Sequence, residues 1–200
     1  MRPLSLGEVR EKAAFWKRLT EPTPILSGNP MRETPSCEEL FELGTFQAGH
    51  FPRATPSGLA LSTLDTRMLA LVSHKPAPPA TIFMRPGKKG EAFRDWFDLM
   101  GDIYLYKRLF AWAELGAVQA EPHTTPDGVP TALCSITALG KSLLRDGLSS
   151  LDQAPPLPIW GVTAYDRSNP WVVVEEAGKG MYLRRLARDL HLVGNLGLGP

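Results

Sequence analysis

Cysteine is scarce in this chain of 200 residues, which contains only Cys37 and Cys134. Two cysteines so far apart form neither a disulfide framework nor a zinc-ligand spacing, so both are predicted to be small buried side chains. The chain also lacks an apolar run long enough to cross a bilayer, and it lacks the pattern of a signal peptide. We therefore expect a cytoplasmic protein without membrane contact.

An excess of charge of one sign is missing as well. Lysine and arginine together number 22, against 21 acidic residues, which gives a formal net charge of +1. Proteins that bind phosphate backbones usually carry a basic excess. Near neutrality therefore argues against strong, non-specific binding of nucleic acid.

Motifs typical of catalysis and ligand binding are also absent. The loop Gly87–Gly90 lacks the residue order of a phosphate-binding P-loop, and no Gly-x-Ser-x-Gly nucleophile turn occurs. The four histidines have no partner at metal-ligand spacing. The sequence therefore predicts a protein that is not an enzyme and has no catalytic residues, metal or cofactor.

The most informative stretch runs from Gly101 to Asp146. Its hydrophobic periodicity and turn residues predict helix, strand, turn, strand and helix, with the turn at Pro126-Asp127-Gly128. The predicted segments are a helix from Asp102 to Leu115, strands 117–120 and 132–136, and a helix 138–144 that Thr137 caps and Gly147 closes.

Apolar spacing predicts which face of the helix 102–115 is buried. Ile103, Tyr106, Phe110 and Ala113 recur at helical spacing, and Leu109 widens this face. The opposite stripe is predicted to face solvent and consists of Tyr104, Lys107, Arg108 and Ala111. We expect Phe110→Ala to destabilise far more than Tyr104→Ala. The expected common core contains Leu64, Met68, Ile103, Phe110, Leu133 and Leu143.

The rest of the chain predicts short elements separated by some of its 19 prolines and 18 glycines. The spacings Ser5–Glu8, Ser36–Glu39 and Ser62–Asp65 each match a capping box and predict a helix start. Arg85–Gly90 is expected to be a basic surface loop. Further predicted elements are helices 79–85, 91–100 and 181–193, strands 160–163 and 171–176, and a loop over 51–58.

Several short motifs carry a resemblance to known proteins. The run Ser135–Leu144 is similar to the strand-to-helix passage after the wing in bacterial winged helix-turn-helix proteins. Leu99–Asp102, Ile136–Gly140, Ile159–Val162 and Asn169–Trp171 resemble the C-terminal part of an uncharacterised bacterial domain-of-unknown-function family. Longer members of that family carry an N-terminal α/β segment that has no counterpart here, so no activity housed there is carried over.

These observations together predict an α+β, mainly helical fold. It would have a winged helix-turn-helix core, an N-terminal helical arm and a C-terminal strand–helix extension. The helix 102–115 would be the second helix of the motif, and the hairpin after it would be the wing. The expected divisions are residues 1–57, 58–148 and 149–200.

Two functions follow from this prediction. One is a nucleic-acid-binding or transcription-regulatory module on double-stranded DNA, by analogy with the fold. The other is a protein–protein contact or assembly module, with a partner or a second copy on the N-terminal arm around Trp16 and Phe41. Gly101–Gly147 holds four basic and five acidic residues, which leaves the two nearly level. The expected nucleic-acid contacts, which would make affinity fall with salt, are Lys88, Lys89, Tyr104, Lys107, Arg108, Arg184, Arg185 and Arg188.

Overall fold

Strands are nearly as common as helices in this protein. The computed structural model describes residues 5–19, 46–72, 75–85, 101–159, 161–176 and 180–186. About 40% of the described residues are helical and about 30% lie in strands, including a mixed four-stranded sheet. The prediction of a mainly helical fold is therefore wrong. The chain is an α+β protein.

The order helix, hairpin, helix after Gly101 is confirmed. The elements are α6 (Asp102–Glu114), β3 (Val118–Thr124), β4 (Pro130–Ile136) and α7 (Ala138–Asp146). Thr137 caps α7 because its hydroxyl accepts a hydrogen bond from the Gly140 amide at 3.2 Å. Gly147 ends the helix with a φ of 79°, a conformation that glycine adopts without strain. Local signals were sufficient to place these elements.

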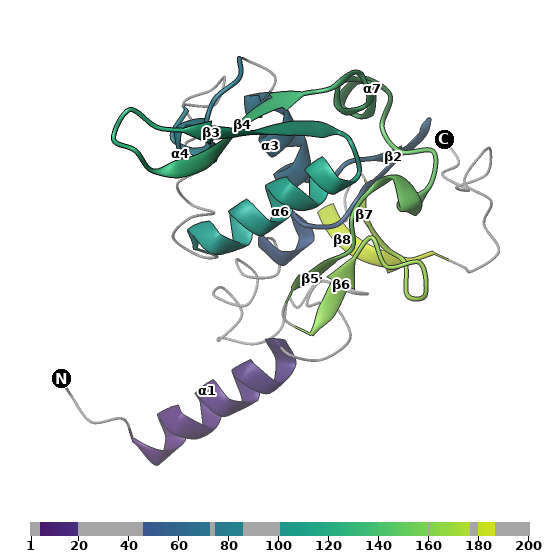
Figure 1. Cartoon of the computed structure of the whole chain (residues 1–200). Coiled ribbons are helices and arrows are strands. Elements are labelled where there is room, and N and C mark those ends of the chain that lie inside the picture. The colour runs from purple at the N-terminus through teal and green to yellow at the C-terminus, as the bar shows by residue number, and fades with distance from the viewer. Residues whose placement is uncertain are drawn as a thin grey trace.

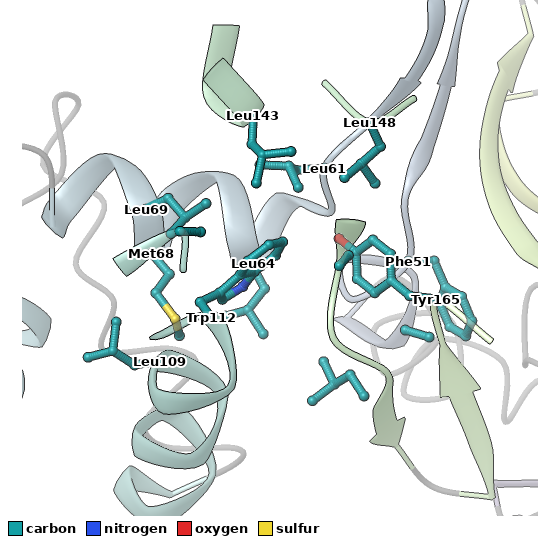
Figure 2. Packing of buried hydrophobic residues seen from close by; sticks show 14 of the residues in the cluster. Phe51, Leu61, Leu64, Met68, Leu69, Leu109, Trp112, Leu143, Leu148 and Tyr165 are labelled. Carbon is teal, nitrogen blue, oxygen red and sulfur yellow. The ribbon is translucent and has the colours of Figure 1, made fainter. Parts of the chain in front are cut away.

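Two further helices pack against this unit, α3 (Thr63–Val72) and α4 (Pro79–Phe83). Figure 2 shows Leu109 and Trp112 of α6 lying beside Leu64 and Met68 of α3, with Leu143 of α7 near Leu61. Leu64, Met68 and Leu143 are buried, as predicted, whereas Leu133 is only partly buried. Outside α6, three of the four predicted core residues are therefore buried.

The four-stranded sheet joins distant parts of the chain (Figure 1). Its order is β2 (Gly58–Ala60), β1 (Arg53–Thr55), β7 (Trp171–Glu176) and β8 (Gly180–Arg185). β1 is antiparallel to β2 but parallel to β7, where Arg53 lies opposite Val173. The predicted loop over 51–58 therefore contains a strand. The hairpin β1–β2 also spans residue 57, where we had expected a boundary.

The predicted helix 181–193 is wrong over its described part, because Gly180–Arg185 forms strand β8. Each residue of β8 has an antiparallel partner in β7, from Glu176 opposite Gly180 to Trp171 opposite Arg185. The β-branched run in β7 provides a strand to pair with, and such tertiary pairing overrides a weak helical periodicity. Residues 187–193 lie outside the described part of the chain.

The remaining elements are short. β5 (Leu157–Ile159) and β6 (Val162–Ala164) form a further short hairpin, close to the predicted strand 160–163, after a 3-10 helix at Leu151–Gln153. The N-terminal helix is confirmed as α1 (Leu6–Leu19), with Leu6 and Val9 exposed. Cys134 is buried as predicted. Cys37, Phe41 and the predicted helix 91–100 lie outside the described residues.

Candidate interaction surface on helix α6

A buried ion pair fixes the orientation of α6. Arg108 Nε donates to Asp65 Oδ1 and Arg108 Nη2 donates to Asp65 Oδ2, each at 2.7 Å. Both side chains are fully enclosed. Because this fork-to-fork geometry satisfies both carboxylate oxygens, it holds α6 against α3 in a single rotational setting.

Three more groups donate to the same carboxylate. Trp112 Nε1 donates to Oδ1 at 2.7 Å, while Ser62 Oγ and the Tyr165 hydroxyl donate to Oδ2 at 2.6 and 2.7 Å. The remaining guanidinium nitrogen, Arg108 Nη1, donates to the Pro155 carbonyl at 2.6 Å. Arg108 also lies over the rings of Trp112 and Tyr165, at 5.3 and 5.2 Å from their centres. The buried charges are therefore fully partnered.

The ionised state of the pair follows from its surroundings. Burial by itself raises the pKa of Asp65, but the adjacent Arg108 charge and the hydrogen bonds outweigh it and hold the pKa below its usual value. Burial likewise disfavours the charged form of Arg108, and Asp65 reverses this so that the Arg108 pKa is raised. The pair remains charged at neutral pH, where it acts as a structural anchor.

The predicted buried face of α6 is only partly correct: Leu109 is buried and Tyr106 and Ala113 are half-buried, as expected, but Ile103 and Phe110 are not buried and Arg108 is. Leu105, Arg108, Leu109 and Trp112 point inward, whereas Ile103 is 69% exposed and Phe110 is 37% exposed. The hydrophobic periodicity gives the wrong centre for this face because it places the charged Arg108 side chain in solvent, whereas Arg108 is buried. The Ser62–Asp65 spacing predicts only a local helix cap, and this cap is present, since the Asp65 amide donates to Ser62 Oγ at 3.0 Å. Asp65 also binds Arg108 and Tyr165, which lie 43 and 100 positions further along the chain, and local sequence patterns do not predict these contacts.

The exposed face of α6, which we call the α6 surface, carries a shallow open groove of about 470 Å³. Tyr106 is half-buried and packs edge-on against Phe83, with ring centres 5.6 Å apart. The described residues that line the groove are Asp102, Ile103, Tyr106, Lys107, Phe110, Ala111 and Glu114. This surface is therefore apolar along its middle, with one lysine, and acidic at both ends.

The predicted nucleic-acid contacts are distributed differently from the expectation. Lys107 is exposed on α6, Tyr104 is half-buried and Arg108 is enclosed. Arg184 and Arg185 lie on β8, where successive side chains point to opposite faces instead of sharing a helical stripe. Lys88, Lys89 and Arg188 lie outside the described residues. Arg108 is thus not available at the surface, and Arg184 and Arg185 do not lie on one face of a helix.

The described residues contain no group of three or more histidine, cysteine, aspartate or glutamate side chains arranged to hold a metal ion. Among the described helices, none combines the length and apolar character required to cross a membrane. Comparison with protein-family models, curated proteins and solved structures found no match. The α6 surface is therefore the feature of the described residues that most clearly suggests a function.

Proposed function

We propose that this protein is a non-enzymatic protein-contact module that uses the α6 surface to bind an amphipathic helix of a different protein. The observation that carries the proposal is the choice of residues that α6 buries and exposes. The helix buries Arg108 in a dedicated set of partners and leaves Ile103 and Phe110 exposed. Burial of a fully exposed side chain of this kind contributes about 1.5–3 kcal/mol, and Ile103 and Phe110 would contribute part of that each, since they are 69% and 37% exposed.

Charge on the α6 surface favours a partner other than a second copy. Asp102 and Glu114 lie at its two ends, about 18 Å apart along the helix axis. In an antiparallel pair of α6 helices with full overlap, Asp102 of one copy would face Glu114 of the other. A parallel pair would place each carboxylate against its equivalent. Since like charges at an interface oppose association, the fitting partner has an apolar stripe flanked by lysine or arginine.

Nucleic-acid binding is less well supported by the same residues. Lys107 is the only basic residue on the α6 surface among those described, and it lies between two carboxylates. The sequence from Val118 to Ile136, which forms the β3–β4 hairpin, contains neither lysine nor arginine. Few phosphate contacts would form on this side of the molecule.

Selection from a displayed library of random helical peptides tests the proposal directly. We expect enriched peptides to carry an apolar stripe flanked by basic residues, and we expect the purified peptides to lose affinity for the Ile103→Asp and Phe110→Asp variants. Val129→Asp provides the matched control, because Val129 is an exposed apolar residue in the β3–β4 turn. Circular dichroism checks that every variant is folded.

Two outcomes would overturn the proposal. One is enrichment of peptides whose binding is the same for Phe110→Asp and Val129→Asp. The other is binding of mixed duplex DNA with a steep salt dependence that Lys107→Gln reduces, which would establish the nucleic-acid function instead.

A further inference from the structure

A second concave site lies between the β1–β2 hairpin and the C-terminal end of α7, away from the α6 surface. In Figure 1, α7 lies beside β2. The cleft has a volume of about 210 Å³. Apolar residues line part of it, and its rim carries two arginines, three hydroxyl groups and one carboxylate. These rim residues are Arg53, Thr55, Ser57, Thr66, Arg145 and Asp146.

A close backbone approach holds the two walls of the cleft together. The Leu148 amide donates to the Leu59 carbonyl at 2.7 Å, which joins the end of α7 to β2. A Cβ atom on Gly147 would lie only 2.3 Å from the same carbonyl oxygen, so only glycine fits there. The separation of the walls is therefore fixed by the backbone.

Strand alternation directs the polar side chains of the hairpin toward the cleft. Leu59 is buried and lies opposite the partly buried Ala54, which places both on the core side of the hairpin. Arg53 and Thr55 occupy the alternate positions and line the cleft. The Arg53 side chain is exposed and has no acidic partner among the described residues.

The opposite wall presents an oriented arginine. Arg145 Nε and Nη2 donate to the two oxygens of Asp146 at 2.8 and 2.7 Å. Ser142 Oγ donates to Asp146 Oδ2 at 3.0 Å and steadies that carboxylate. A guanidinium has five N–H groups, so Arg145 retains donors after this pairing.

We infer that this cleft binds a phosphoryl group, either as free phosphate or on a small phosphate ester. A carboxylate offers only two oxygens in one plane, and one guanidinium fork can engage both of them. Two guanidinium groups on opposite walls instead suit a tetrahedral group that offers oxygens in both directions. The hydroxyls of Ser57 and Thr66 can supply further donors, whereas the Thr55 hydroxyl already donates to the Gly58 carbonyl at 3.1 Å. The rim has a net charge of +1 at neutral pH, since Asp146 offsets one arginine.

The test is a titration of the folded full chain with inorganic phosphate at constant ionic strength. Two-dimensional ¹H–¹⁵N spectra recorded at each phosphate concentration monitor the binding. We expect saturable shifts in the amide signals of Thr55 and Gly147. We expect Arg53→Gln and Arg145→Gln each to weaken binding about tenfold, because each removes charged hydrogen bonds to the ligand. Asp146→Asn should strengthen binding, since it removes the opposing carboxylate.

Matched controls separate a built site from general charge. Lys141→Gln removes one positive charge from an exposed position of the same helix and should leave phosphate affinity unchanged. Acetate should bind more weakly than phosphate, and a parallel titration with glycerol phosphate distinguishes an ester from the free ion. The inference is overturned if phosphate causes no saturable shift, or if Lys141→Gln weakens binding as much as Arg53→Gln does.

Discussion

Tyr165 and Asp65 are joined by a buried hydrogen bond of 2.7 Å across 100 positions of the chain. The same hydroxyl oxygen accepts a hydrogen bond from the Ser62 amide, also at 2.7 Å. In an ordinary capping box the acidic side chain would take that amide directly. Here Tyr165 stands between the amide and the carboxylate and so ties the C-terminal part of the chain to the start of α3.

The backbone of Tyr165 reflects this role. Its φ is 58°, a left-handed value that is uncommon for a large side chain. Such a conformation persists where the surrounding contacts determine it. The two hydrogen bonds of the hydroxyl group and the contact with Arg108 are those contacts. Local strain is thus offset by the buried cluster.

Breaking the ion pair from one side should be strongly destabilising. Asp65→Asn leaves the Arg108 charge buried without its counter-ion, and we expect a loss of about 3–5 kcal/mol in the free energy of unfolding. Urea denaturation measures the loss. Lys107→Ala, an exposed change on the same helix, is the control and should stay within about 0.5 kcal/mol. Equal losses for the two variants would show that the pair does not anchor α6.

The orientation of α6 changes the expectation for Phe110, which is 37% exposed, and keeps the one for Leu109, which is buried. Leu109→Ala removes a fully buried side chain and should lower the free energy of unfolding by about 2–5 kcal/mol. Phe110→Ala, one position further along, removes a side chain that is partly exposed and should cost clearly less. Denaturant midpoints of both variants decide the matter. A larger loss for Phe110→Ala would restore the face predicted from periodicity.

Gly140 should not tolerate a methyl group although it lies within a helix. A Cβ atom there would lie 2.3 Å from the Ala117 carbonyl oxygen and 2.8 Å from Ile136 Cγ1. We expect Gly140→Ala to lower the free energy of unfolding by about 1–3 kcal/mol, because the steric clash outweighs the stabilisation that alanine gives a helix relative to glycine. Gly7→Ala in α1 is the control, because its nearest neighbour would be at 3.8 Å. Thermal melting of both variants checks this, and a stable Gly140→Ala protein would contradict the close contact.

His50 should make stability fall in weakly acidic solution. Burial lowers the pKa of His50 from 6.5 to about 4, while Nδ1 donates to the Phe46 carbonyl at 3.0 Å. Between these two values the unfolded chain binds a proton that the folded chain does not. The free energy of unfolding therefore keeps its full value above pH 6.5. It declines as the pH falls toward 4, by about 3 kcal/mol in total.

The measurement is urea unfolding at a series of pH values. His50→Asn keeps a donor near the Phe46 carbonyl and should remove most of this slope. His123→Asn changes an exposed histidine and should leave the slope as it is. The assignment to His50 fails if both variants retain the full decline.

The sequence by itself determined the order of α6, β3, β4 and α7 and the start of each helix, although β3 runs on to Thr124 and β4 begins at Pro130. Their signals are local: Thr137 caps α7, Gly147 ends it, and Gly128 occupies a turn with a φ of 79°. Such features act over a few residues, so they hold whatever the rest of the chain does. The boundaries of β7 followed in the same way from its β-branched run.

Only the tertiary structure decided which face of α6 is buried and which strands pair. An arginine enters a core when a carboxylate and a carbonyl are positioned to receive it, and Asp65 and Pro155 lie 43 and 47 positions away. The pairing of β8 with β7, and of β1 with β7, likewise depends on backbone groups brought together by the fold. The α6 surface exists because that distant carboxylate takes Arg108 inward, and this turns Ile103 and Phe110 outward.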